Sequence, residues 1–211
     1  MSSKRRVVVT GLGIVSPLGN DLETTWKNIL NGESGAARIT KFDASDFSTT
    51  FAAELKGYDD ISGLSQKETR RIDPFVQYAL TASNQAITDA NLALENLDTK
   101  RIGVSIGSGI GGLGSIEDNS IILKEKGPKK ISPFFVPGAI INMASGNVAI
   151  KYNLQGPNIS IVSACSSAGH SIGYSARTIS YGDADIMITG GSEAGITPLG
   201  LAGFNASKAL S

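Results

Sequence analysis

The sequence predicts an α/β layered domain, in which a parallel or mixed β-sheet is covered by helices. Short runs rich in β-branched residues alternate with longer amphipathic segments, and glycines stand where the runs end. Such alternation is typical of sheets whose two faces are both covered. With 211 residues, the chain is long enough to remove roughly 70% of its unfolded surface from water. We therefore expect one domain over residues 1–211 that needs neither disulfides nor metals.

The first expected element is a short buried strand over residues 6–10. Valines run together there, and the run stops at the turn Gly11-Leu12-Gly13. The basic start followed by an apolar run resembles a secretion signal. Glycines and Pro17 interrupt that run well before the roughly 20 residues that span a bilayer, so a strand is the better interpretation.

Helix-start patterns mark three later segments. Asn20 and Glu23 have the spacing of a capping box. The same spacing recurs at Ser65 and Glu68, before a basic turn. Asp73-Pro74 opens a third helix, because proline is favoured in the first helical turn.

The centre and the end of the chain supply the remaining elements. Residues 102–106 predict a strand that ends in the glycine-rich segment Gly107-Ser108-Gly109-Ile110-Gly111-Gly112. Residues 131–150 are apolar and rich in small side chains, so we expect them to be buried. The later elements are a strand over residues 159–164, a helix over residues 166–181 and a strand over residues 185–190.

The charge balance and the cysteine usage restrict the function. Lysine plus arginine number 19 and aspartate plus glutamate number 19, so the chain as a whole has no field that attracts nucleic acid or an anionic membrane. The single cysteine, Cys165, cannot form an internal disulfide, and a lone thiol is typical of a reducing compartment. We expect a cytoplasmic protein with no nucleic-acid and no membrane partner.

Cys165 is the candidate nucleophile because of its place between two predicted elements. It lies where the strand over residues 159–164 ends and the helix over residues 166–181 begins. The unpaired amides and the dipole of a helix N-terminus favour a thiolate by about 0.3–1 kcal/mol, and by up to roughly 2 kcal/mol when partly buried. Free cysteine is also a common inert core residue, so from the junction alone both roles stay open.

The single histidine of the chain, His170, is five residues further on. On a helix it is turned by roughly 140° from position 165, outside the i+3 and i+4 set that shares a face. We therefore interpret His170 as a structural residue and expect the catalytic base to be missing from these residues.

Several segments together form an ordered pattern along the whole chain. The most distinctive is Ser163-Ala164-Cys165-Ser166-Ser167-Ala168-Gly169-His170. It resembles the active-site segment of β-ketoacyl-acyl-carrier-protein synthases, and the elongation enzymes of dissociated bacterial fatty-acid synthesis are the most similar members. Further matching segments are residues 7–13, 106–112, 131–137, 182–185, 190–193 and 197–200.

The resemblance implies a thiolase-like layered fold of two related βαβ halves, of which residues 1–211 would be the amino-terminal half only. It implies a ping-pong reaction in which Cys165 accepts an acyl group from acyl-carrier protein, and malonyl-carrier protein then loses carbon dioxide and condenses with it. No metal or redox cofactor is needed. Two histidines and a lysine of the second half complete the site in the family, so the isolated chain is expected to be inactive in condensation.

The resemblance also assigns binding residues and a homodimer. Ile110 matches the acyl-pocket residue that limits chain length, and Phe135 matches an aromatic that reaches the neighbouring subunit's pocket. Each is also compatible with an ordinary core position. The basic surface that docks the acidic carrier protein is matched by Lys67, Arg70, Arg71, Lys129, Lys130 and Lys208.

Three other functions stay open on the sequence. The segment around Cys165 is near the ketosynthase domains of polyketide assembly. A non-catalytic dimer scaffold would use the same fold, although Cys165 argues against the chain-length factor, a relative that lacks the nucleophile. A dinucleotide-binding oxidoreductase is the third, because Gly107, Gly109 and Gly112 satisfy G-x-G-x-x-G after a predicted strand.

Overall fold

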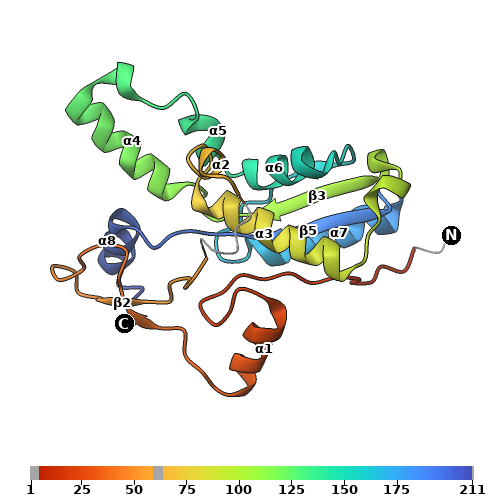
Figure 1. The fold of residues 1–211 in the computed structure, drawn as a ribbon, viewed down its shortest axis with the longest axis horizontal. Helices are drawn as coiled ribbons and strands as arrows, with labels where there is room; N and C mark the ends of the chain where they lie inside the picture. The colour runs from red at the N-terminus through yellow and green to blue at the C-terminus, as the bar shows by residue number, and fades with distance from the viewer. Residues whose placement is uncertain (1–4, 59–63, 211) are drawn as a thin grey trace.

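A three-stranded parallel sheet forms the centre of the computed structural model, which describes residues 5–58 and 64–210. The middle strand is β3 (Ile102–Gly107), with β4 (Asn158–Ile159) on one side and β5 (Ile186–Gly191) on the other (Figure 1). Val104 of β3 stands opposite Asn158 and Ile188. The strands over residues 102–106 and 185–190 are therefore confirmed within one residue at their ends.

Helices cover both faces of this sheet, as predicted for an α/β layered domain. The helices α3 (Pro74–Asp89) and α6 (Met143–Tyr152) pack on one face, and α7 (Ser167–Tyr181) packs against β3 and β5 on the other. The buried apolar core lies on the α3 and α6 side. It is built from Phe75, Val76, Ala79, Leu80, Ile87, Ile102, Val104, Ile106, Ala144, Val148, Ala149, Leu154 and Ile188.

The two faces of the sheet are covered in different ways. On the α7 side, the buried helix residues are small and polar: Ser167, Ser171, Ser175 and Thr178. Their small size allows α7 to lie close to the sheet. One glycine of each long strand also faces the helix, since a Cβ on Gly191 would lie 2.5 Å from the Cβ of Ala168.

The remaining elements surround this centre. A small antiparallel pair, β1 (Ala37–Arg38) and β2 (Phe51–Ala52), lies near α8 (Pro198–Ala206). The helix α4 (Leu113–Lys126) projects away from the sheet and buries none of its residues (Figure 1). The others are α1 (Leu22–Leu30), α2 (Gln66–Thr69), α5 (Phe135–Ala139) and the 3₁₀ turns η1 (Leu94–Asn96), η2 (Thr99–Arg101) and η3 (Pro128–Lys130).

Two of the three predicted helix starts are confirmed. Ser65 and Glu68 form the full capping box of α2, and the Asp73 side chain caps α3 with Pro74 in its first turn. The start of α1 was predicted one residue too early. Asp21 is the cap, because the side chain of Asn20 instead donates a hydrogen bond to the carbonyl of Lys56 at 2.6 Å.

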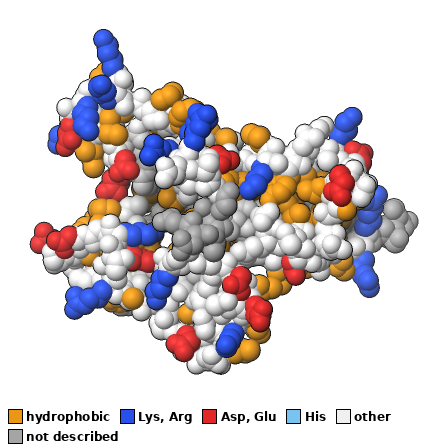
Figure 2. Space-filling model, in the orientation of Figure 1, with side chains coloured by type: hydrophobic (Ala, Val, Ile, Leu, Met, Phe, Trp, Pro, Cys, Tyr) orange, Lys and Arg blue, Asp and Glu red, His pale blue; other side chains and the backbone are white. Residues whose placement is uncertain are grey.

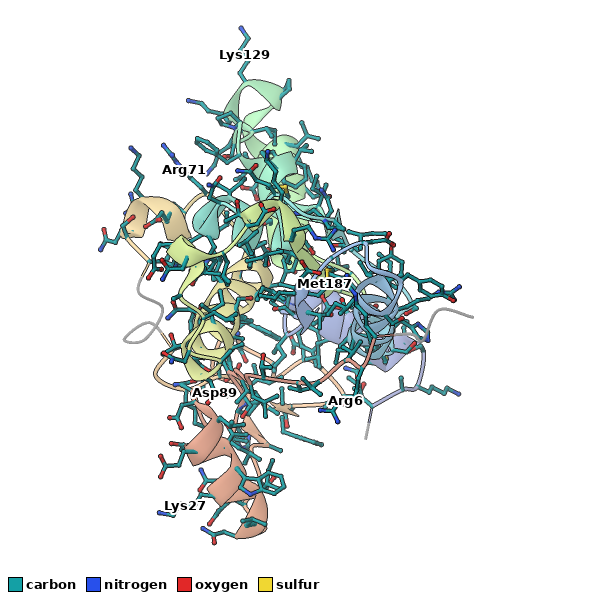
Figure 3. The ribbon with its side chains drawn as sticks, turned by 90° about the vertical axis from the view of Figure 1, so that its right-hand side faces the viewer. Arg6, Lys27, Arg71, Asp89, Lys129 and Met187 are labelled. Atoms are coloured by element: carbon teal, nitrogen blue, oxygen red, sulfur yellow. The ribbon has the colours of Figure 1, made fainter. Side chains whose placement is uncertain are left out.

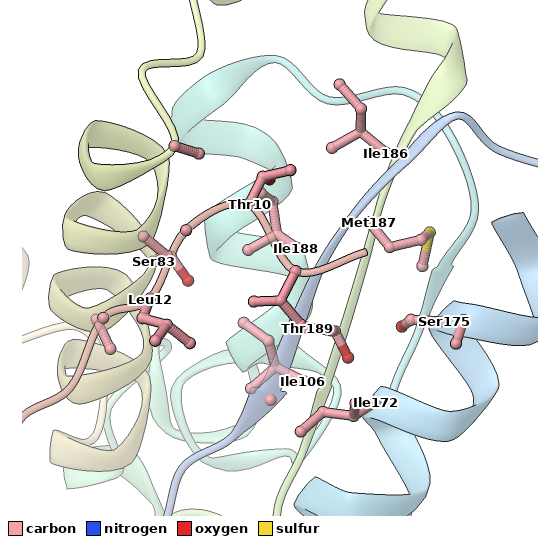
Figure 4. A pocket seen from close by; sticks show the side chains of 18 of the residues that line it. Thr10, Leu12, Ser83, Ile106, Ile172, Ser175, Ile186, Met187, Ile188 and Thr189 are labelled. Carbon is pink, nitrogen blue, oxygen red and sulfur yellow. The ribbon is translucent and has the colours of Figure 1, made fainter. Parts of the chain in front are cut away.

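The predicted first strand over residues 6–10 is wrong. The segment joins no strand, and the side chains of Val8 and Val9 are 59% and 75% exposed. It runs between α3 and α7 beside β5 and leaves a cavity of about 470 Å³ there (Figure 4). The residues after this segment are held by side chains and not by strand pairing. The amides of Leu12 and Ile14 donate hydrogen bonds to the side chains of Asp89 and Gln85 of α3.

The predicted strand over residues 159–164 is much shorter in the structure. A side chain enters the ladder between β3 and β4: the hydroxyl of Ser145 accepts a hydrogen bond from the Ile106 amide at 2.8 Å and donates to the Ile159 carbonyl at 3.0 Å. The hydroxyl of Ser160 donates to the Ile106 carbonyl at 2.8 Å. Serine hydroxyls thus take the backbone positions that a longer strand would need.

The prediction that residues 131–150 are buried holds for only part of the segment. Ala144, Ser145 and Val148 on the inner face of α6 are fully buried. Val136 and Ile150, in contrast, are 58% and 74% exposed. The segment is divided between α5 and α6, and only α6 packs against the sheet. None of the helices in the described ranges is long and apolar enough to cross a membrane.

Asp185 ties the start of the described chain to the sheet, and we expect this tie to be lost in acid. Its carboxylate accepts from Arg101 at 3.0 and 3.1 Å and from Arg5 at 2.6 Å. The two guanidinium groups, Arg101 first, lower the pKa of Asp185 from 3.8 to about 2. A folded-state pKa below the unfolded value stabilises the fold above the unfolded pKa, and this stabilisation disappears as the pH falls through the folded pKa.

The expected result for Asp185→Asn is a lower urea midpoint at pH 7 and a difference from the wild type that narrows as the pH falls below about 4. Asp118→Asn, on the projecting helix α4, is the control and should change little. A difference that is the same at pH 7 and at pH 3 would show that the ion pairs do not account for it.

Candidate active site

Cys165 lies on the turn that leads from the sheet into α7, at the position predicted from the sequence, and its side chain is exposed. The residue before it, Ala164, has a φ of +53°. This left-handed conformation costs a non-glycine residue on the order of 1–3 kcal/mol. Hydrogen bonds hold the turn in place: the amides of Ser166 and Ser167 donate to the carbonyls of Ser163 and Ala164 at 3.2 and 3.1 Å.

The N-terminus of α7 carries no side-chain cap. Ser166 is at the cap position, but its hydroxyl donates to the Ser163 carbonyl at 2.7 Å instead of accepting from the helix amides. The hydroxyl of Ser167 likewise donates to the Ala164 carbonyl at 2.7 Å. No side-chain oxygen therefore caps the amides at the start of α7, next to Cys165. The positive end of a helix dipole favours negative charge near such an uncapped start.

Gly107, at the end of β3, allows the turn that carries Cys165 to pack directly against the sheet. A Cβ on Gly107 would lie 2.7 Å from the carbonyl oxygens of both Ile161 and Ser167. These two residues flank the turn. The end of the strand thus fixes the backbone on both sides of the thiol.

The imidazole of His170 pairs with the side chain of Ser163. Its Nδ1 lies 2.6 Å from the hydroxyl of Ser163. Within residues 5–58 and 64–210 no hydrogen bond joins the imidazole to the thiol. His170 therefore links the first turn of α7 to the segment before Cys165, and in the part of the chain that the structure describes it is not hydrogen-bonded to the candidate nucleophile.

The glycine-rich loop after β3 encloses a carboxylate of the chain itself. The amides of Gly109 and Ile110 donate to Glu193 Oε2 at 2.7 and 3.0 Å, and the amide of Gly111 donates to Oε1 at 3.2 Å. The hydroxyl of Ser108 donates to Oε1 at 3.0 Å. A dinucleotide phosphate would need these same amides, so the G-x-G-x-x-G pattern does not mark an open phosphate site.

Ile110 and Phe135, far apart in the sequence, line the same apolar cavity of about 480 Å³. Val162, three residues before Cys165, lines it as well. The sequence prediction missed Val162. Residues two apart on a strand point to the same face, so the predicted strand already placed Val162 on the same face as Ser160, which also lines the cavity. The other lining residues are Ile116, Val136, Ala139, Ile140, Ile141, Asn142 and Ser160.

The six basic residues predicted to dock a carrier protein do not form one patch. Lys67 lies in α2 and Arg70 caps its end, whereas the Arg71 guanidinium stacks on Phe134 at 4.5 Å. Figure 3 shows Arg71 and Lys129 toward the same end of the molecule. Lys129 and Lys130 form η3 just beyond α4, where basic side chains gather in Figure 2.

Lys208 lies apart from the other basic residues. It follows α8, whose Leu199 amide donates to Glu117 in the first turns of α4. η3 lies beyond the opposite end of that helix, and 14 residues of α-helix extend about 21 Å. Lys208 therefore lies toward the start of α4, whereas Lys129 and Lys130 lie beyond its end.

A known family accounts for this combination of a thiol at a helix start, a glycine-rich loop and an apolar cavity. The family model described as β-ketoacyl synthase, N-terminal domain, matches residues 4–211. The chain belongs to the β-ketoacyl synthase family. The resemblance stated from the sequence is thereby confirmed.

Curated relatives of this β-ketoacyl synthase chain are closely similar over its whole length. The 3-oxoacyl-[acyl-carrier-protein] synthase 2 of Vibrio cholerae serotype O1 is 53% identical over 209 residues, and that of Coxiella burnetii is 55% identical over 208 residues. Each alignment covers 99% of this chain and 50% of the relative. The chain thus spans about half the length of the curated relatives it matches.

The fold agrees with solved structures of ketosynthases. The structure described as the ishigamide ketosynthase/chain length factor superposes with a TM-score of 0.87 at 25% identity, covering 99% of this chain and 52% of that one. This β-ketoacyl synthase chain therefore has the layered α/β fold of the amino-terminal part of a ketosynthase.

Proposed function

We propose that this chain is the acyl-accepting, amino-terminal half of a condensing enzyme of fatty-acid elongation. The observation that carries the proposal is the exposed Cys165 thiol at the uncapped start of α7, in a chain of the β-ketoacyl synthase family. The exposed sulfur is open to an incoming acyl thioester. The apolar cavity with Ile110 and Phe135 offers a place for the acyl chain.

The proposed reaction has two stages. The Cys165 thiolate attacks the carbonyl of an acyl-carrier thioester, the carbon–sulfur bond to the carrier breaks, and the carrier leaves as its thiol after taking up a proton. Malonyl-carrier protein then loses carbon dioxide, and its carbanion attacks the acyl-enzyme. A carbon–carbon bond forms, the Cys165 thiolate is released, and the product is a β-ketoacyl-carrier two carbons longer.

The second stage needs groups that this chain does not supply. Its single histidine, His170, is bonded to Ser163. Decarboxylation needs donors that stabilise the developing enolate oxygen. We infer that a carboxy-terminal half contributes them, in agreement with the half-length match to the curated relatives.

The partners that fit this function are acyl-carrier protein and malonyl-carrier protein, in a cytoplasmic homodimer. The relatives at 53% and 55% identity are named for the acyl-carrier protein. Lys67, Arg70 and Arg71 at α2, with Lys129 and Lys130 at η3, would meet an acidic carrier. We place Lys208 on the margin of that surface, because α4 separates it from η3.

The alternatives have less support. The identity to the structure described as a ketosynthase/chain length factor is 25%, well below the 53% and 55% to the 3-oxoacyl-carrier-protein synthases, so a polyketide pathway is the second choice. A non-catalytic scaffold does not need an exposed thiol at a helix start. Dinucleotide binding would require displacement of Glu193 from the glycine-rich loop.

The proposal is tested by comparing the chain alone with a fusion to the second half of the Vibrio cholerae relative. We expect the folded fusion to take an acyl group from acyl-carrier protein on Cys165, detected by mass, and to form β-ketoacyl product with malonyl-carrier protein. The 211 residues alone should form none. Condensing turnover by the chain alone would contradict the half-site proposal, and a folded fusion that takes no acyl group would contradict the function.

A further inference from the structure

Glu193 is exposed, yet its carboxylate accepts several hydrogen bonds from a loop that belongs to another strand. It follows β5 by two residues, yet its carboxylate reaches the loop after β3. It accepts four hydrogen bonds there, from the amides of Gly109, Ile110 and Gly111 and from the hydroxyl of Ser108, at 2.7 to 3.2 Å. Bonds to a carboxylate are roughly twice as strong as neutral ones, so this contact holds the loop more firmly than ordinary turn hydrogen bonds would.

The loop is shaped around this carboxylate. A Cβ on Gly109 would lie 2.9 Å from Glu193 Oε2, so a side chain there would meet the carboxylate. Gly111 has a φ of +79°, a conformation that favours glycine. Among the described residues, the amides of Gly109 and Ile110 have only Glu193 as a hydrogen-bond acceptor.

The same loop touches both parts of the candidate site. Ile110 lines the apolar cavity, and the Ser108 carbonyl accepts from the Ser167 hydroxyl at 3.3 Å. The Cβ position of Gly109 is 3.5 Å from the backbone of Ala164, next to the nucleophile. One carboxylate therefore fixes the position of the cavity wall relative to the thiol.

We propose that Glu193 is a positioning residue that determines acyl-chain selectivity by holding Ile110 at the cavity wall. The inference rests on the proposed acyl transfer to Cys165. It predicts an effect that depends on the length of the acyl chain, because a released Ile110 loop changes the space for the chain while the thiol keeps its own turn. A residue that served the fold alone would change the rates for all chain lengths by the same factor.

The test uses the fusion enzyme with Glu193→Ala, Glu193→Gln and the control Glu95→Gln, which changes an exposed carboxylate in η1. The rate of Cys165 acylation is measured by mass with short-chain and long-chain acyl-carrier proteins. We expect Glu193→Ala to change the ratio of the two rates by about tenfold. Glu193→Gln should fall in between, since an amide keeps one acceptor oxygen, and Glu95→Gln should equal the wild type.

Hydrogen exchange at the amides of Gly109 and Ile110 is the second readout and should become faster in Glu193→Ala. An unchanged rate ratio, or equal losses at all chain lengths, would overturn the inference even if the exchange is faster. If Glu193→Ala does not fold, the ratio in Glu193→Gln decides. If the folded wild-type fusion takes no acyl group from any carrier, the proposed function fails and the inference fails with it.

Discussion

Cys165→Ala is expected to abolish acyl transfer from acyl-carrier protein to the fusion enzyme, with a loss of at least about a thousandfold. The sulfur is the atom that forms the thioester, and Cys165 is the single cysteine of the sequence. The fold should survive, because an exposed side chain contributes little to the core. The measurement is the mass of the acylated protein against time, with the thermal midpoint as the check on folding.

Two further variants make this test specific. Cys165→Ser keeps the shape of the side chain but replaces a thiol with a far less acidic hydroxyl, so we expect nearly the same loss. His170→Ala should keep most of the acylation rate, because the imidazole is bonded to Ser163 and not to the thiol. A loss of about 10²–10⁴-fold in His170→Ala would identify it as the general base and contradict our interpretation.

Gly107→Ala is expected to destabilise the chain by about 1–3 kcal/mol and to displace the Cys165 turn. The added methyl group would lie 2.7 Å from the carbonyl oxygens of Ile161 and Ser167, and 2.8 Å from the Ser171 hydroxyl. Two of these three atoms belong to the backbone and cannot rotate away. The effect is measured as the free energy of unfolding in urea, together with the acylation rate of the fusion enzyme.

Gly173→Ala is the matched control for this substitution. It lies in the middle of α7, and a Cβ there would have nothing within 4 Å. Alanine is favoured over glycine in a helix interior by roughly 0.5–1 kcal/mol, so this variant should be as stable as the wild type or more stable. Equal stability of the two variants would show that the contact at Gly107 is relieved at no cost.

Local patterns were enough where neighbouring residues decide the structure. The capping box at Ser65 and the Asp73-Pro74 start are confirmed, because a helix cap depends on atoms within four residues. The strand that begins at Ile102 is also confirmed, since an apolar strand has to be buried. The predicted strand over residues 6–10 fails because a strand also needs a partner backbone, and local sequence does not supply one.

The sequence by itself determined the family and the helix that begins after Cys165, and it predicted Cys165 as the candidate nucleophile, since these depend on short contiguous segments such as residues 163–170. Only the tertiary structure decided what meets these segments. It places Ile110 and Phe135 in one cavity and fills the glycine-rich loop with Glu193. The physical reason for the Glu193 contact is that the parallel sheet aligns the carboxyl ends of β3 and β5, so residues 84 apart along the chain meet. Phe135 is brought to the cavity by α5, whose Ala139 carbonyl accepts from the amide of Gly112 in the glycine-rich loop.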